Sequence, residues 1–175
     1  MIFSLLLACS PSADDIAKAV HSENPVMRED GAKIAQNYSD EVVEKALVAV
    51  LADESVDVRL NAIESLAEIE ATTANPTLVD RLNADEDARV RRAAADALGR
   101  LKAKEAVPAL LLYVEGFGPN DREQLAGVWA LGNIGGEGLE AEAKKGVLTT
   151  LSALRVGTSD PYVRYVTSAA LRTLK

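Results

Sequence analysis

The stretch Asp87-Ala-Arg-Val-Arg-Arg-Ala-Ala-Ala-Asp-Ala-Leu98 opens with a pentad that occurs in five copies along the 175-residue chain. The copies begin at Asn24, Ser55, Asp87, Asn120 and Asp160. Counted from their fifth residues, the copies are 31, 32, 33 and 40 residues apart. A period of this size is typical of arrays of helix-turn-helix units. The sequence therefore predicts a helical repeat array, and such arrays mostly provide binding surfaces.

Each pentad predicts the start of a helix. Its first residue is Asn, Ser or Asp, whose side chain accepts hydrogen bonds from the free N–H groups of a first helical turn. Pro25 and Pro161 follow directly, where a missing N–H costs nothing. Positions +3, +6 and +7 after the fifth residue share one helical face. A small residue at +3 and a leucine at +7, as in Ala94 and Leu98, predict a core face that a partner helix approaches closely.

The segments between the pentads predict the first helix of each pair. We expect Ser39 to cap one of these helices, a second to begin at Asn75-Pro76, and a third to end at Gly116, because a helix C-terminus favours a residue that tolerates positive φ. The glycines of 135–138 separate the fourth repeat from a longer fifth one. No segment alternates in the manner of a β-strand.

These motifs resemble the HEAT repeat family, particularly its phycobilisome-lyase-type HEAT-like repeats, whose second helix reads DxxVRxxAAxAL. The second, third and fifth copies match this pattern, whereas the fourth has Glu123 and Gln124 in place of Val-Arg. The resemblance covers residues 14–175. It implies an all-α, right-handed α-solenoid of about five HEAT-like helix pairs.

The N-terminus carries a second signal. Leu6-Leu7-Ala8-Cys9 resembles a bacterial lipobox, in which the cysteine is lipidated and becomes the first residue of the mature protein. This predicts a signal segment at 1–8, a tether at 9–13 and a repeat domain at 14–175. With Ser10 after the cysteine, the resemblance implies the outer membrane of a Gram-negative envelope, on the periplasmic side. Alternatively, the apolar run caps the first repeat and Cys9 is an ordinary buried residue.

Composition narrows the class of partner. The chain has 27 acidic and 19 basic residues and a net charge of −8, which disfavours a groove that follows nucleic-acid phosphates. The main basic cluster has acidic neighbours, and it comprises Arg89, Arg91, Arg92 and Arg100. We therefore expect a protein or peptide partner, with the membrane contacted only through a lipid on Cys9.

Residues of catalytic type are sparse. His21 is the only histidine, and we expect it at the exposed end of the first helix. The glycines of 132–138 lack the preceding strand and following Lys-Ser/Thr of a phosphate loop. With a single cysteine, a disulfide framework and a Cys-based zinc site are excluded. The sequence predicts a non-enzymatic protein without a metal or cofactor.

Two sets of residues are candidates for a structural or functional role. In HEAT arrays, the arginine at the fifth pentad position resembles a ladder element that pairs with an acidic residue of a neighbouring repeat; here it is Arg28, Arg59, Arg91 and Arg164. Positions +1 and +5 point away from the core, on the helices that line the concave side of HEAT arrays. They include Arg92, Asp96, Leu125, Trp129 and Tyr165, and an apolar row there predicts partner binding. Alternatively, a rotated fourth repeat tucks Trp129 between repeats.

Three functional classes follow. The favoured one is an envelope-tethered scaffold that binds a protein or peptide on its concave face. The second is a cytosolic HEAT adaptor or regulatory subunit that carries no lipid. The third, suggested by related repeats in bilin lyases, is a subunit for chromophore attachment; it needs a tetrapyrrole pocket and predicts an absorbance change when bilin is added.

Overall fold

The computed structural model describes residues 11–174, so the predicted signal segment and Cys9 lie outside the described residues. The described part contains ten α-helices, four short 3-10 segments and no β-strand. The helices form five pairs, and the fold is the predicted all-α solenoid. The chain divides into two compact units, residues 1–74 and 75–175.

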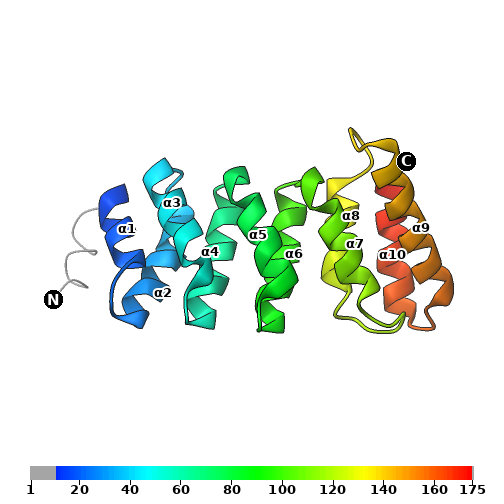
Figure 1. Cartoon of the computed structure of the whole chain (residues 1–175), viewed down its shortest axis with the longest axis horizontal. Coiled ribbons are helices and arrows are strands. Elements are labelled where there is room, and N and C mark those ends of the chain that lie inside the picture. Colours follow the sequence, from blue (N-terminus) through cyan, green and yellow to red (C-terminus); the bar gives the residue numbers. More distant parts are fainter. Residues whose placement is uncertain (1–10, 175) are drawn as a thin grey trace. The chain divides into compact units, whose positions relative to one another are not determined.

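The first unit contains two helix pairs. Its helices are α1 (Ala13–Val20), α2 (Pro25–Ile34), α3 (Glu41–Ala49) and α4 (Val56–Glu68). The first helices α1 and α3 pack together, as do the second helices α2 and α4 (Figure 1). Ile16, Leu47 and Leu66 are fully buried between these two layers.

The second unit contains three helix pairs. Its helices are α5 (Asn75–Ala84), α6 (Ala88–Arg100), α7 (Val107–Glu115), α8 (Leu125–Ile134), α9 (Ala141–Gly157) and α10 (Pro161–Thr173). Here α5, α7 and α9 form the first-helix layer, and α6, α8 and α10 form the second. Leu98, Leu110 and Leu131 are fully buried in its core.

The pentads begin helices in four of the five repeats. The side chains of Asn24, Asp87 and Asp160 accept hydrogen bonds from the first turns of α2, α6 and α10. Ser55 occupies the same position before α4 without such a bond. The predicted cap at Ser39 is wrong by one residue, because the Asp40 carboxylate accepts the Val42 N–H at 2.8 Å.

The fourth pentad does not begin a helix, and its first residue, Asn120, has partners outside its own repeat. Its side-chain oxygen accepts the backbone N–H groups of Ser159 at 2.7 Å and Asp160 at 3.2 Å. Helix α8 starts later, at Leu125. The prediction of an N-cap at Asn120 is therefore wrong, and the residue fastens the loop before α8 to the loop before α10.

The predicted core face is confirmed. All five +3 residues are buried: Gly31, Ala62, Ala94, Gly127 and Thr167. A Cβ added at Gly31 would lie 2.8 Å from the Val20 nitrogen, and one at Gly127 would lie 2.7 Å from Val114 Cγ2. Because real Cβ atoms do not approach so closely, the small residue is what lets the two helices of a pair touch.

Helix α7 ends with Gly116 as its C-cap, as predicted, but Gly116 has φ −68° and does not use the left-handed conformation that glycine tolerates. Positive φ occurs instead at Gly135, after α8, at Gly138 in the following loop, and at two residues with side chains, Glu70 and Lys102. Lys102 has φ 52° and belongs to a tight helix ending in which the Ala103 N–H bonds the Leu98 carbonyl at 3.0 Å.

Replacing the exposed Lys102 with glycine should stabilise the protein. The left-handed conformation costs a residue with a Cβ about 1–2 kcal/mol, whereas glycine loses about 0.5–1 kcal/mol through extra freedom in the unfolded chain. We expect Lys102→Gly to raise the free energy of unfolding by about 0.5–1 kcal/mol in urea titrations. Lys102→Ala, which removes the charge but keeps the Cβ, is the control, and equal stability of the two variants would contradict the prediction.

Candidate partner-binding site

The candidate site lies on the second-helix layer of the second unit, between α8 and α10. Trp129 and Asn133 are one turn apart on α8, and Tyr165, Ala169 and Thr173 follow the same spacing on α10. Trp129 is 39% exposed and Tyr165 is 67% exposed, although both are large aromatic residues. Two aromatic side chains therefore remain open to solvent on neighbouring helices.

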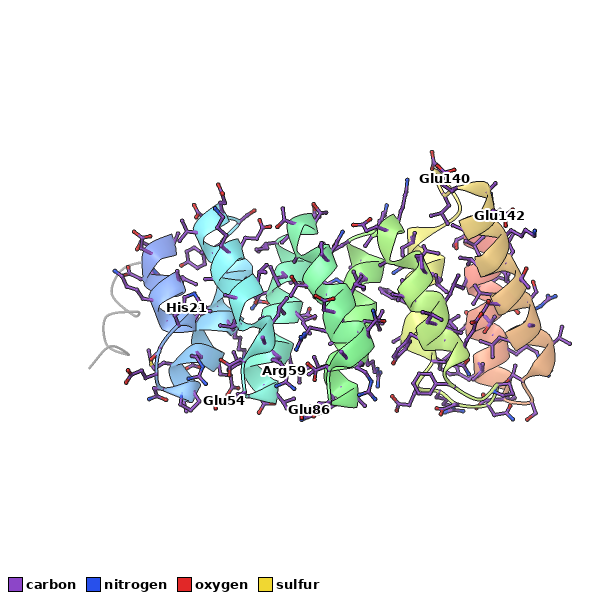
Figure 2. All side chains as sticks on the ribbon, viewed as in Figure 1. His21, Glu54, Arg59, Glu86, Glu140 and Glu142 are labelled. Atoms are coloured by element: carbon purple, nitrogen blue, oxygen red, sulfur yellow. The ribbon has the colours of Figure 1, made fainter. Side chains whose placement is uncertain are left out.

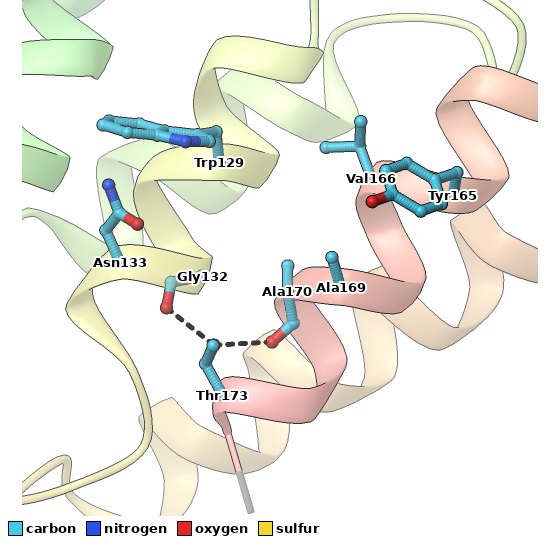
Figure 3. A pocket seen from close by; sticks show the side chains of 8 residues that line it. All are labelled: Trp129, Gly132, Asn133, Tyr165, Val166, Ala169, Ala170 and Thr173. Carbon is cyan, nitrogen blue, oxygen red and sulfur yellow. Dashed lines mark hydrogen bonds between the residues drawn. The ribbon is translucent and has the colours of Figure 1, made fainter.

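The two helices enclose a groove of about 230 Å³. It is lined by Trp129, Gly132, Asn133, Tyr165, Val166, Ala169, Ala170 and Thr173 (Figure 3). Figure 3 shows Trp129 and Tyr165 on opposite sides of the opening. The floor is narrow because a Cβ at Gly132 would lie only 2.9 Å from Ala170 Cβ. Small residues thus make the floor, and aromatic residues make the walls.

One hydroxyl fastens the groove at the end of α10. Thr173 Oγ1 lies 2.6 Å from the Gly132 carbonyl oxygen of α8 and 2.7 Å from the Ala170 carbonyl oxygen of its own helix. Because a hydroxyl has one proton, it donates to one of these carbonyls at a time. The bond to Gly132 links the two walls directly.

The structure brings together two of the five predicted surface residues, Trp129 and Tyr165. Leu125 is half-buried and does not line the groove, while Arg92 is exposed and Asp96 half-buried on α6. One edge of the Trp129 ring packs toward α6, since a Cβ at Gly99 would lie 3.3 Å from its Cζ3 atom. Trp129 is therefore partly tucked against its neighbour and partly open.

Sequence reasoning missed three lining residues with side chains, Asn133, Val166 and Thr173. Extending the +1 and +5 series by one more helical turn would have reached Asn133 and Thr173. Val166 gave no such signal, because it lies on the side of α10 that turns toward α8.

The fifth residue of the pentad makes the same hydrogen bond within its own repeat in all five copies. Arg28, Arg59, Arg91 and Arg164 each donate to the backbone carbonyl six residues upstream, at 3.0, 2.8, 2.8 and 2.5 Å. Gln124 repeats this contact in the fourth repeat, to the Gly118 carbonyl at 2.7 Å. This residue therefore ties the turn between the two helices of each pair to the second helix, a role that the sequence reasoning did not identify.

The predicted ladder contact is present at Arg28. Its guanidinium donates to both carboxylate oxygens of Asp53, at 2.7 and 3.1 Å, and to Glu54 at 3.2 Å. Asp53 belongs to the next helix pair, so this bidentate ion pair links two repeats of the first unit (Figure 2 labels Glu54).

For Arg91 and Arg164 the prediction of an ion pair with a neighbouring repeat is wrong. Their hydrogen bonds go to backbone carbonyls of their own pair, at Asp85, Glu86 and Thr158. Arg91 lacks the carboxylate because Gly118 occupies the position in the next repeat that Asp53 occupies in the second. Arg59 is buried and bonds the Asp53 and Glu54 carbonyls (Figure 2).

The environment of Asp53 stabilises its charged form. Burial by itself raises the pKa of this carboxyl, but hydrogen bonds from Arg28 and the Ser55 N–H, together with the positive charges of Arg28 and Arg59, lower it overall. The carboxylate is thus held ionised by the same arginine that links the repeats.

The other residues of catalytic type have ordinary positions. His21 is exposed and forms the C-cap of α1, as expected (Figure 2). Gly135 ends α8, with φ 72°.

Within residues 11–174, no group of three His, Cys, Asp or Glu side chains could hold a metal ion. None of the helices described is long and apolar enough to cross a membrane.

A stack of helix pairs whose second helices form one continuous layer in each unit defines a repeat protein of the α-solenoid class. The family model described as HEAT repeats matches residues 43–117 and 76–175. The chain belongs to the HEAT repeat family, as its pentads predicted.

No curated protein matches the chain. Among solved structures, the complex of CpcE and CpcF of phycocyanin lyase from Nostoc sp. PCC7120 contains a similar chain, with 24% identity and a TM-score of 0.78. The match covers 96% of this chain and 66% of that one, so this chain spans about two thirds of its neighbour's length. At this identity the likeness shows the fold alone.

Removing the Asp53 charge should destabilise the protein in a pH-dependent way. Because the folded pKa of Asp53 is lowered, its contribution is fully present above the unfolded pKa of about 3.9 and is lost as pH falls through the folded value. We expect Asp53→Asn to lower the free energy of unfolding by about 2 kcal/mol at pH 7, the size of a hydrogen bond to a charged group. Below about pH 4 the loss should be smaller. Urea unfolding across pH 2–7 measures the difference.

The exposed Asp57, in the first turn of α4, supplies the control variant Asp57→Asn. A gap between Asp53→Asn and the parent protein that stays constant down to pH 2 would contradict the assigned role of the ion pair.

Proposed function

We propose that this protein is a non-enzymatic scaffold that binds a protein or peptide at the groove between α8 and α10. The observation that carries the proposal is the pair of exposed aromatic walls, Trp129 and Tyr165, over an apolar floor. Folding alone favours burying such side chains, and Trp and Tyr are enriched at the energetic centres of protein interfaces.

The construction of the groove supports this proposal. The close approach of Gly132 to Ala170 and the Thr173 bond hold the two walls in place before a partner arrives. A preformed site loses less conformational entropy on binding. Its volume of about 230 Å³ lies below the ~300–1,000 Å³ of most small-molecule pockets, so it suits one side chain of a larger partner.

Membership of the HEAT repeat family also supports a protein partner, and the similar solved chain was found in a complex of two proteins.

Site-specific photo-crosslinking in the native host tests the scaffold function. A photoreactive phenylalanine analogue in place of Tyr165 should yield a discrete protein adduct, because this side chain lies at the wall of the groove. The same analogue at Leu112, which is 68% exposed on the first helix α7, is the control. Equal crosslinking at both positions, or none at position 165, would overturn the proposal.

We further propose that Cys9 carries a lipid anchor that tethers the scaffold to the bacterial envelope, on the periplasmic side of the outer membrane in a Gram-negative host. The support is the sequence Leu6-Leu7-Ala8-Cys9. The mass of the N-terminal peptide, from protein expressed in its own host with the upstream reading frame, is the test. A diacylglyceryl-modified Cys9 as first residue is expected, whereas an unmodified N-terminal peptide that retains Met1 would favour the cytosolic adaptor.

A further inference from the structure

The charged side chains that flank the α8–α10 groove carry a net positive charge, whereas the net charge of the whole chain is −8. On α6, Arg92, Asp96 and Arg100 are spaced by four residues and share one face. On α10, Arg172 lies on the face of Tyr165 and Ala169, seven residues after Tyr165. We call Arg92, Arg100 and Arg172 the arginine rim.

The rim belongs to the same surface as the groove. Helix α6 packs beside α8, and the Trp129 ring extends toward Gly99, next to Arg100. Arg92 and Arg172 are both exposed. A partner that fills the groove and continues along this layer in either direction therefore meets an arginine.

The excess of positive charge is local. Positions +1, +5, +8 and +9 of the second helices in the second unit carry three arginines and one aspartate. The same positions of α2 and α4 carry one lysine and three glutamates: Lys33, Glu29, Glu64 and Glu68. With a chain charge of −8, an acidic partner is repelled by most of the molecule and attracted at this surface.

Resting on the proposed scaffold function, we infer that the partner is an acidic peptide segment that inserts one aliphatic or aromatic side chain between Trp129 and Tyr165. The groove supplies the apolar contact, and Arg92 and Arg172 face the flanking carboxylates. Asn133 is exposed at the groove, and its amide can both donate to and accept from a peptide backbone.

The helix spacing limits where the acidic residues stand. Packed helices lie about 8–10 Å apart, and an extended chain advances about 3.3 Å per residue. Each helix of the layer therefore corresponds to about three residues of a peptide crossing it. The carboxylates are expected within about five residues of the inserted side chain, on either side.

Selection from a displayed library of random twelve-residue peptides, on the immobilised full chain, tests the inference. The expected peptides carry one Leu, Ile, Phe or Trp with at least two Asp or Glu within five residues of it. Parallel selection on Tyr165→Ala, a change at an exposed side chain that should leave the fold intact, should lose them. Trp129 is the only tryptophan, so its fluorescence reports groove occupancy when a selected peptide is titrated.

Charge reversal then separates the rim from the groove. Arg92→Glu and Arg172→Glu should each weaken binding of the selected peptide by about three- to tenfold at low salt, and by less at high salt. The milder Arg172→Gln should have a smaller effect in the same direction. Arg155→Glu, at an exposed arginine on α9, has the same charge change away from the groove and should change affinity less than twofold.

Each outcome decides something. If the selected peptides bind only when Tyr165 is present but have neutral or basic residues beside the inserted side chain, the inference of an acidic partner is wrong and the scaffold function remains supported. Peptides indifferent to Tyr165→Ala would overturn both. A selection that enriches nothing overturns the inference, and crosslinking at position 165 then decides the scaffold function by itself.

Discussion

The hydrogen bond from the fifth pentad residue to the carbonyl six residues upstream is the contact on which the repeat architecture depends. It occurs at Arg28, Arg59, Arg91, Gln124 and Arg164, so it survives even where arginine is replaced. A turn between packed helices leaves backbone carbonyls without helical partners, and burying them unpaired is costly. One long side chain satisfies one of these carbonyls and ties the turn to the second helix. It does so in four repeats where the helix starts three residues before it, and in the fourth repeat, where α8 starts directly after Gln124. The net contribution of one such bond to stability is modest, because in the unfolded chain the same groups bond water.

The fourth repeat departs from the pattern, and this departure builds the groove. Helix α8 starts late, and Asn120 bonds the loop at Ser159 and Asp160 rather than a first helical turn, on the side where α10 begins. At the opposite end of α10, Thr173 bonds the Gly132 carbonyl. The last two helix pairs are thus joined near both ends of α10. The side chains of Asn120 and Thr173 bond backbone groups across the two pairs and hold the groove walls together without a ligand.

Much of this fold could be predicted from the sequence, since capping residues, small +3 residues and leucines at +7 act locally and repeat. Trp129 and Tyr165 were also found, because helical periodicity alone places them outside the core. Asn120 was misassigned because its partners lie 39 and 40 residues away, where no local pattern reaches. An ion pair with a neighbouring repeat was predicted for every pentad arginine. Such a pair needs a carboxylate in the loop of the next repeat, which Asp53 supplies for Arg28 and which Gly118, at the same position, cannot supply for Arg91. Val166 depends on how α10 is rotated against α8, which only packing decides.

The division between repeats that match the family pattern and repeats that do not has a functional meaning. In a solenoid, each helix pair contacts only the neighbouring pairs. The consensus positions of a repeat therefore serve the packing between pairs and are not available to a partner. The third repeat follows the pattern closely, and its second helix supplies a charged face. The fourth repeat lacks the Val-Arg of the pentad, and its helix α8 is apolar nearly all round, with Trp129 only partly covered by its neighbours. An aromatic residue that stacking buries only in part, on the same layer as a tyrosine and arginines, is where this array can differ from others of its family. Recognition is therefore expected where the repeat pattern is weakest.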